Sequence, residues 1–425
     1  MTDQVEIRPL LGKLAASVTV PGSKSITNRA LLMAAMAPGE STLSSALISD
    51  DTRYMIGALR ELGFTVRVNE SLGEVEVNGG AGKIPCSQAN LFVGGSGTAM
   101  RFLAGFLTLG QGAYRLDGNA RMRQRPIGNL LQALSNLGLA VRSEHDNGCP
   151  PVLIEVNGSG FKGGATRIDA SLSSQFVSAL LLPAPLWPEG LRLTIDGLAA
   201  EPFVLMTLRL MQRAGIRCTM DGNAALIPGG QHYRCGHTTI EADASSASYF
   251  AAAAVICAGR VRLNHLRRDS VQGDVHFLDL LEQMGARVTW QEDAVEVAGG
   301  DFLRGMDVDM SGLPDMVPTL AVLAPFAHSP TTIRKVQFIR HHESDRLHAL
   351  ANELARLGVT VDERPDGLVI YPATPKAASV ETYDDHRIAM SFSVLGLRVP
   401  GIKIKDPGCV SKTYPRFFVD LASLG

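Results

Sequence analysis

The stretch Ala58-Leu59-Arg60-Glu61-Leu62-Gly63-Phe64-Thr65-Val66-Arg67-Val68 contains the pattern that decides the fold. A helical run ends in an apolar residue, Gly63 follows, and residues of alternating polarity come next. Glycine is favoured where a helix ends in a left-handed conformation, and alternation of apolar and polar residues is typical of a strand. Similar endings recur roughly every 70 to 75 residues, at Gly138, Gly215, Gly285, Gly358 and Gly425. The chain is therefore predicted to contain six copies of one structural unit.

Each unit is predicted to hold two helices, because a second polar helix start lies upstream of each terminal glycine. The first helices are expected to begin near Lys24, Gly97, Ser173, Ser245, Pro314 and Asp384, and the second near Asp50, Arg125, Glu201, Gln272, Glu343 and Lys412. The sixth unit reaches the end of the sequence before its last strand, and the strand-like segment Val5 to Val20 is expected to supply it.

This repeat count predicts an α/β (α+β) fold of two domains with three units each. One domain is expected to span residues 22–240, and the other to combine residues 1–21 with 241–425, so that the chain crosses twice between them. A single large α/β domain is the alternative, which fits neither the usual size of a domain nor the number of repeats.

Pro21-Gly22-Ser23-Lys24-Ser25-Ile26-Thr27-Asn28-Arg29 is a candidate anion site at a helix start. Ser23 or Ser25 is expected to cap the helix. The first-turn amides have no partners within the helix and carry the positive end of its dipole, so a phosphate there would meet backbone donors, Lys24 and Arg29 together. An ordinary capped helix with two surface cations is the alternative, and this stretch alone favours it.

Three further stretches have ligand-binding chemistry at predicted helix starts. Gly94-Gly95-Ser96-Gly97 forms a turn in which glycine permits close approach of a ligand to the backbone, and residues 121–125 contain three arginines. Ser173-Ser174-Gln175 presents two hydroxyls and an amide, of which capping explains one. A solvated basic loop and simple capping are the alternatives.

The last two units combine acids with cations at helix starts. Capping and the helix dipole account for Asp315 and Glu343, but cations such as Arg346, Arg387 and Lys412 are unfavourable in first turns unless they hold an anion. Comparable cations in the first predicted domain are Lys24, Arg29 and Arg125. We therefore expect a doubly anionic substrate bound in the cleft between the two domains, with two acids left for proton transfer.

Composition limits the function classes. The 425 residues are 45% hydrophobic and 19% charged, which is typical of a globular protein, and the net charge of −2 argues against a broad nucleic-acid footprint. The six cysteines show no metal-binding spacing, and no apolar run approaches the length of a membrane span. We expect a cytoplasmic monomer with reduced thiols, no metal, no cofactor, and no nucleic-acid or membrane partner.

These motifs together resemble the 5-enolpyruvylshikimate-3-phosphate synthase family of enolpyruvyl transferases. The similarity extends nearly from end to end and runs through Pro21-Gly22-Ser23-Lys24-Ser25, Gly97-Thr98-Ala99-Met100-Arg101, Arg125-Pro126-Ile127, Ser173-Ser174-Gln175, Glu343-Ser344-Asp345-Arg346, Asp385-His386-Arg387 and Lys412-Thr413. The family implies two domains of three βαβαββ units each, in agreement with the repeat count. The resemblance also implies that the protein acts in the shikimate pathway, which leads to chorismate and the aromatic amino acids, and that it is a target of the herbicide glyphosate.

The resemblance implies a role for each matching residue. Phosphoenolpyruvate would be held by Lys24, Gly97, Arg125, Gln175, Arg346, Arg387 and Lys412, and shikimate 3-phosphate by Ser25, Arg29, Ser173, Ser174, Gln175, Asp315 and His342. The 5-hydroxyl attacks C2 of the enolpyruvate while C3 gains a proton, and phosphate then leaves as C3 loses one. Asp315 is expected to act as base at the 5-hydroxyl, Glu343 to exchange the proton at C3, and Lys24 to neutralise the departing phosphate.

Four positions depart from the commonest pattern of the family, namely Ala200, Phe203, Phe338 and His342. His342 could bind the shikimate phosphate as the imidazolium. Because the ring loses this charge as pH rises through neutrality, the affinity for shikimate 3-phosphate would then fall.

Two other functions remain open. The sister transferase that acts on UDP-N-acetylglucosamine carries a loop cysteine where this chain has Ala120. A non-catalytic phosphometabolite-binding protein would have no use for both Asp315 and Glu343.

Overall fold

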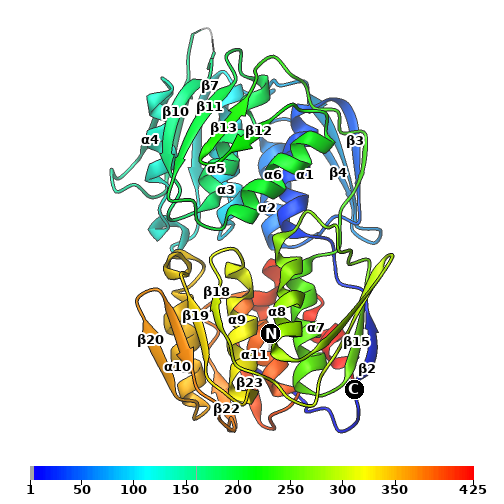
Figure 1. Cartoon of the computed structure of the whole chain (residues 1–425). Coiled ribbons are helices and arrows are strands. Elements are labelled where there is room, and N and C mark those ends of the chain that lie inside the picture. Colours follow the sequence, from blue (N-terminus) through cyan, green and yellow to red (C-terminus); the bar gives the residue numbers. More distant parts are fainter. Residues whose placement is uncertain (1–3, 159) are drawn as a thin grey trace. The chain divides into compact units, whose positions relative to one another are not determined.

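The computed structural model describes residues 4–158 and 160–425. Contacts between Cα atoms divide the chain into two compact units, a first unit of Gly22–Ile240 and a second unit of Met1–Pro21 with Glu241–Gly425. Helices and strands alternate throughout both units (Figure 1). The fold is mixed α/β, as the sequence predicts.

The first unit begins and ends within a single sheet, because its last strand pairs with its first. Its helices are α1 (Lys24–Met36), α2 (Asp50–Glu61), α3 (Gly97–Phe106), α4 (Gly128–Asn136), α5 (Ser174–Leu181) and α6 (Glu201–Arg213). Its strands are β3 (Pro38–Ser44), β4 (Thr65–Asn69), β5 (Glu74–Gly80), β6 (Gln88–Phe92), β7 (Gly112–Asp117), β8 (Ala140–Ser143), β9 (Val152–Val156), β10 (Gly164–Asp169), β11 (Leu191–Asp196), β12 (Thr219–Asp221), β13 (Ala224–Ile227) and β14 (His237–Thr239).

The second unit repeats this plan with its own set of elements. Its helices are α7 (Ala244–Ile256), α8 (Phe277–Met284), α9 (Val317–Leu323), α10 (Arg346–Arg356), α11 (His386–Gly396) and α12 (Phe417–Ala422). Its strands are β1 (Gln4–Glu6), β2 (Ala15–Val18), β15 (Arg260–Asn264), β16 (Arg287–Gln291), β17 (Ala294–Ala298), β18 (Asp307–Asp309), β19 (Thr331–Arg334), β20 (Val361–Arg364), β21 (Gly367–Ile370), β22 (Ala378–Val380) and β23 (Ile402–Lys405).

Every four-stranded sheet has the same strand order and the same pairing directions. In the sheet β6-β7-β9-β8, for example, β6 and β7 are parallel with α3 between them, and β8 and β9 form an antiparallel hairpin after α4. The segment from β6 to β9 is therefore a βαβαββ unit. The glycines that end the second helices at Gly63, Gly138, Gly215, Gly285 and Gly358 have φ between 80° and 114°. Their left-handed conformation confirms the helix endings read from the sequence.

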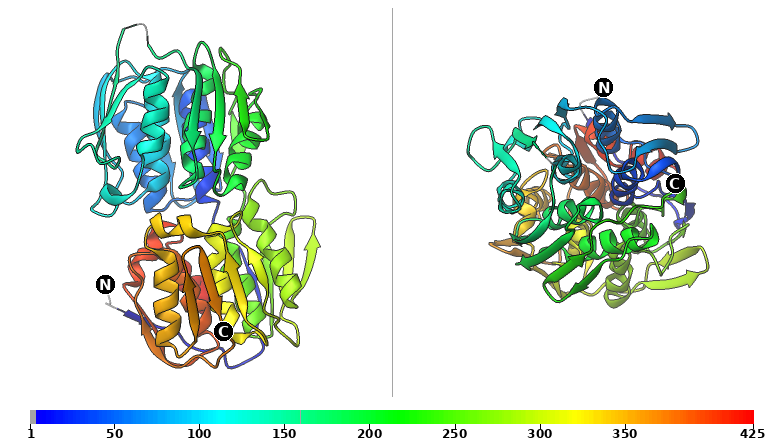
Figure 2. Two further views of the ribbon diagram at one scale, coloured as in Figure 1. Left: turned by 60° about the vertical axis from the view of Figure 1, so that its left-hand side comes forward. Right: turned by 90° about the horizontal axis from the view of Figure 1, so that it is seen from above.

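The N-terminal segment supplies strands to two different sheets. Gln4–Glu6 pairs antiparallel with β23, where the sixth repeat lacks its last strand. Figure 2 shows this segment in dark blue beside the orange and red end of the second unit. Ala15–Val18 instead pairs parallel with β15 in the fourth repeat, and β14 provides the equivalent strand beside β3 in the first repeat.

Two kinds of helix alternate along the chain. The helices α3 and α7 are buried on all sides, whereas α2 and α10 bury one face only. In the second unit the buried helices α7, α9 and α11 contact one another and form the core. Small residues such as Ala251 to Ala254 allow this close packing, and polar side chains remain at the helix starts. Among the described residues, no helix has the length and apolar character to span a membrane.

Candidate active site

Arg346 is the centre of a charged cluster in the second unit. Its side chain opens α10 and is only 1% exposed. Its Nη1 donates to Oδ1 of Asp315 at 2.9 Å, its Nη2 to Oε2 of Glu343 at 3.0 Å, and its Nε to Oδ2 of Asp385 at 2.8 Å. Burial opposes the charge of Arg346, but Asp385, Glu343 and Asp315 outweigh it and raise its pKa. A permanent cation thus joins three carboxylates.

Asp315 connects Arg346 with a second buried arginine. Arg387, in the first turn of α11, donates from Nη2 to Oδ2 of Asp315 at 2.7 Å, and its Nη1 lies 3.4 Å from the hydroxyl of Tyr249. Burial lowers the pKa of Arg387, but Asp315, Tyr249, Asp274 and Asp243 together outweigh it, so the net shift is upward. Each oxygen of Asp315 therefore accepts a hydrogen bond from a different arginine.

Glu343 lies between Arg346 and Lys412. The Nζ atom of Lys412 is 3.6 Å from Oε1 of Glu343, while Oε2 accepts from Arg346. Lys412 does not open a helix as the sequence suggests: it ends the 3₁₀ helix Pro407–Lys412, and α12 begins only at Phe417. A cation is favourable at the carboxyl end of a helix, so local structure alone explains its charge there.

His342 contacts the cluster through its Nδ1 atom, which lies 3.1 Å from Nη1 of Arg346. A guanidinium can only donate hydrogen bonds, so Nδ1 accepts and the ring is the neutral Nε2–H tautomer. The imidazolium expected from the sequence is therefore not the form that this contact favours. Phe338 packs against the ring at 6.1 Å between centroids, which places two of the unusual residues side by side.

Asp385 completes the cluster through a contact that no local sequence pattern predicts. It is fully buried, caps α11 by accepting from the amide of Arg387, and accepts a hydrogen bond from Ser344. The pair Asp384-Asp385 before a helix start indicates a cap. Its ionic contact with Arg346, 39 residues away, is visible only in the folded chain.

Several of the expected residues of the first unit lie at helix starts. Lys24 opens α1, and its Nζ is 3.4 Å from Oδ2 of Asp51, a buried acid at the start of α2. Ser23 is the N-cap residue of α1, but its side chain accepts no capping hydrogen bond. The side-chain cap predicted for Ser23 or Ser25 is therefore wrong for Ser23, although the helix begins where expected. Ser25 follows Lys24 in the first turn.

Arg29 lies deep within the first unit, with 2% of its surface exposed. Its guanidinium donates to the hydroxyls of Thr207 and Ser178 and to the carbonyl oxygens of Ser25 and Phe203. Burial lowers the pKa of Arg29 to about 9, so the side chain remains a cation at neutral pH. All four of these acceptors are neutral groups.

Gly97 and Arg125 are direct neighbours. A Cβ atom added to Gly97 would lie 2.7 Å from Nη2 and 2.8 Å from Nη1 of Arg125. The guanidinium thus rests on the backbone at the start of α3, where Ser96 caps the helix by accepting from the amide of Ala99. Of the other arginines in this loop, Arg123 pairs with Asp117 at 2.6 Å and so has a structural role.

The hydroxyl-rich helix start at α5 confirms the predicted cap. Ser173 is the N-cap residue and accepts from the amide of Gln175 at 3.2 Å, while Ser174 is buried in the first turn. Ala200, one of the unusual residues, holds a left-handed conformation before α6, and the carbonyl of Phe203 accepts from Arg29.

The chain is similar to one family over nearly its whole length. The family model described as EPSP synthase (3-phosphoshikimate 1-carboxyvinyltransferase) matches residues 10–421. A curated relative from Trichormus variabilis, named 3-phosphoshikimate 1-carboxyvinyltransferase, is 47% identical over 98% of both chains, and one of the same name from Aeromonas salmonicida is 44% identical over 97% of both. A solved structure of EPSP synthase from Acinetobacter baumannii covers 100% of this chain and 98% of its own, with a TM-score of 0.82 and 27% identity. The chain therefore belongs to the EPSP synthase family.

Proposed function

We propose that this chain transfers the enolpyruvyl group of phosphoenolpyruvate to the 5-hydroxyl of shikimate 3-phosphate and releases phosphate. Relatives with 43% to 47% identity carry the name 3-phosphoshikimate 1-carboxyvinyltransferase. The pathway is the shikimate route to chorismate and the aromatic amino acids. The observation that carries the proposal is the pairing of Asp315 with two arginines: one of its oxygens accepts a hydrogen bond from Arg346 and the other from Arg387.

This arrangement suggests how the cluster prepares its acids for proton transfer. Phosphate and carboxylate groups are strong acceptors for guanidinium donors, so a bound anion competes with Asp315 and Glu343 for Arg346 and Arg387. A carboxylate that loses such a partner becomes more basic. Substrate binding thus raises the basicity of both carboxylates, so that Asp315 can accept the hydroxyl proton and Glu343 can take up the proton that it gives to C3.

Three residues carry the chemistry in this proposal. Asp315 takes the proton of the 5-hydroxyl as its oxygen attacks C2 of the enolpyruvate. Glu343 takes up a proton before the addition, gives it to C3, and takes one back in the elimination, when the bond from C2 to the phosphate oxygen breaks. Lys24 neutralises the charge that develops on the departing phosphate and passes it a proton. Asp315 returns the hydroxyl proton to Lys24, so the proton lost by the 5-hydroxyl leaves with the phosphate.

The remaining residues bind and orient the substrates. We assign phosphoenolpyruvate to Lys24, Gly97, Arg125, Gln175, Arg346, Arg387 and Lys412, and shikimate 3-phosphate to Ser25, Arg29, Ser173, Ser174, Gln175, Asp315 and His342. His342 would donate its Nε2–H to the shikimate phosphate, in keeping with the neutral tautomer that Arg346 favours. Because the assigned residues come from both units, we propose that both units bind the same pair of substrates. Holding two anions together supplies the proximity that the reaction needs.

A phosphate-release assay with two acceptors tests the proposal. We expect release from phosphoenolpyruvate with shikimate 3-phosphate and none with UDP-N-acetylglucosamine. The epoxide fosfomycin should leave activity intact, because Ala120 offers no thiol to alkylate. Turnover with the nucleotide sugar alone would assign the chain to the sister activity, and turnover with neither acceptor would favour a binding protein.

We further propose that the enzyme works as a cytoplasmic monomer without nucleic-acid or membrane partners. The support is its net charge of −2 and the pathway in which its family acts. Light scattering at assay concentrations tests the monomer directly.

A further inference from the structure

Asp274 is a buried acid that the proposed mechanism leaves unused. It lies in the 3₁₀ helix Gly273–His276, before α8, and is 5% exposed. Its Oδ2 accepts a hydrogen bond from the hydroxyl of Ser245, in the first turn of α7, and its Oδ1 has no hydrogen-bond partner among the described residues. A buried oxygen without a partner costs more free energy on a carboxylate than on a neutral carboxylic acid. The geometry therefore favours the protonated form.

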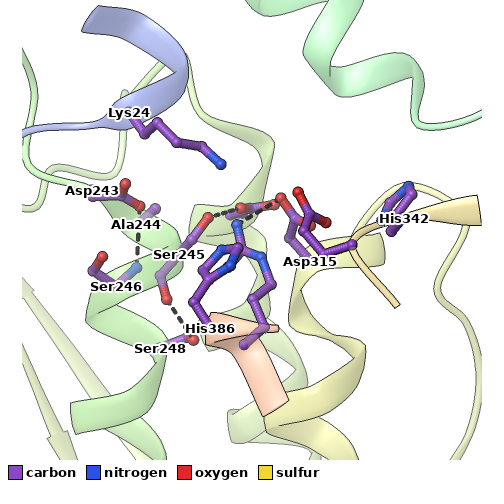
Figure 3. Close-up of polar contacts among 12 residues, drawn as sticks. Lys24, Asp243, Ala244, Ser245, Ser246, Ser248, Asp315, His342 and His386 are labelled. Atoms are coloured by element: carbon purple, nitrogen blue, oxygen red, sulfur yellow. Dashed lines mark hydrogen bonds and ion pairs between the residues drawn. The ribbon is translucent and has the colours of Figure 1, made fainter. Parts of the chain in front are cut away.

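The charges around Asp274 belong to the candidate active site. Figure 3 shows Ser245 on the side of α7 that faces Asp315. Burial and, after it, the negative charge of Asp315 raise the pKa of Asp274 to about 7, and Arg387 acts in the opposite direction. The carboxyl group of Asp243, which caps α7, adds to the upward shift, and the hydrogen bond from Ser245 opposes it.

The other elements that pack against the 3₁₀ helix contribute little charge at this point. Within α7, Tyr249 is the next titratable residue, and burial raises its pKa to about 12, so it stays neutral. On α8, Asp279 pairs with His276 at 2.8 Å at the protein surface, and Glu282 is exposed. The ionisation of Asp274 is therefore governed by burial and by its neighbours in the active-site cluster.

We propose that Asp274 is a positioning residue for the transfer reaction, which by holding a proton leaves the positive charge of Arg387 to Asp315 and to the anionic substrate. This inference rests on the proposed function. An ionised Asp274 would compete with Asp315 and the substrate for the positive charge of Arg387. It would also repel a substrate carboxylate or phosphate bound to Arg387. Loss of the proton should therefore weaken phosphoenolpyruvate binding without removing any group that takes part in the chemistry.

Kinetics of Asp274→Asn between pH 6 and pH 8.5 test the proposal. Asparagine keeps the acceptor for Ser245 and cannot ionise. At saturating shikimate 3-phosphate, the ratio of wild-type to variant KM for phosphoenolpyruvate should be about 1 at pH 6 and rise ~3- to 10-fold by pH 8.5, with similar kcat. The ratio cancels the ionisation of the substrate and of His342, which both enzymes share.

Two further variants separate this effect from damage to the fold. Ser245→Ala removes the hydrogen bond that favours ionised Asp274, so its KM should begin to rise at higher pH than that of the wild type. Asp279→Asn is the matched control, because it neutralises an exposed acid, and its profile should follow the wild type. A KM ratio for Asp274→Asn that does not change with pH would overturn the proposal. So would a loss of kcat at every pH with unchanged KM.

Difference infrared spectroscopy of the enzyme without substrates gives a readout independent of activity. Between pH 6 and pH 8 the wild type should lose the carbonyl band of a protonated carboxyl group, and Asp274→Asn should lack that change. Its absence from the wild type would refute a protonated Asp274 even if the transferase activity is confirmed. If the wild type shows this loss of the carbonyl band but has no transferase activity, the protonation of Asp274 is supported and only the proposed function is refuted.

Discussion

Substitution of Gly97 by alanine should weaken phosphoenolpyruvate binding while leaving the fold intact. The new methyl carbon would lie 2.7 Å from Nη2, 2.8 Å from Nη1 and 3.0 Å from Cζ of Arg125. Ordinary contact between such atoms needs roughly 3.5 Å or more, so the guanidinium must move by about 1 Å. It can do so because it is the end of a flexible side chain rather than backbone.

The size of the effect follows from what that movement disrupts. We assign Arg125 to phosphoenolpyruvate, and a hydrogen bond to a charged group contributes about 1.5–3 kcal/mol. Its loss corresponds to a ~10- to 100-fold rise in KM for phosphoenolpyruvate. Stability should not fall, because Gly97 is the first residue of α3 and alanine has the higher helix propensity, by up to about 1 kcal/mol.

Phosphate release at varied phosphoenolpyruvate and saturating shikimate 3-phosphate gives the KM, and thermal unfolding gives the stability. Gly57→Ala is the matched control: Gly57 lies within α2, and an added Cβ would meet nothing within 4 Å. This control should keep the wild-type KM and gain stability slightly. A wild-type KM for Gly97→Ala would refute either the contact with Arg125 or the role assigned to that arginine.

Three further predictions concern single residues. Glu343→Gln should reduce kcat by a factor of ~10² or more while shikimate 3-phosphate binding, measured by calorimetry, stays near the wild type, since an amide cannot exchange a proton; near-normal kcat would remove Glu343 from the mechanism. Lys24→Met should raise the KM for phosphoenolpyruvate as well as lower kcat, by about 1.5–3 kcal/mol in kcat/KM, and an unchanged KM in steady-state assays would contradict a contact with the substrate phosphate. Asp274→Asn should change the pH dependence of thermal stability: the folded protein holds its proton up to about pH 7, whereas an unfolded Asp releases it near 3.8, so the wild type loses stability as pH rises through that range. Relative to the wild type the variant should therefore gain up to about 4 kcal/mol between pH 4 and pH 8, and a Tm difference independent of pH would argue against the buried proton.

The repeat architecture could be read from the sequence because its determinants are local. A left-handed glycine after an apolar helix end is specified by a few adjacent residues, and Gly63, Gly138 and Gly285 adopt that conformation. Alternating residues such as Thr65–Asn69 form strands for the same reason. The missing strand of the sixth repeat also follows from counting, and Gln4–Glu6 fills it.

The sequence likewise identified which chemical groups gather at helix starts. A cation in a first turn opposes the helix dipole, so Arg346 and Arg387 indicated an anionic partner. The structure supplies that partner from within the chain, as Asp315 binds both of them. Lys412 was the exception, because it ends a 3₁₀ helix rather than opening a helix.

Only the tertiary structure decided how these charges pair and which protons they hold. The contacts of Arg346 with Asp315 and Asp385 join residues 31 and 39 positions apart, and no local pattern encodes such a pairing. The neutral tautomer of His342 depends on one guanidinium atom 3.1 Å away. The proton on Asp274 depends on burial beneath elements from distant repeats. Local sequence therefore determines helices, strands and turns. Charge pairing and protonation instead depend on the combined electrostatic effect of groups that are distant in the sequence and that only folding brings together.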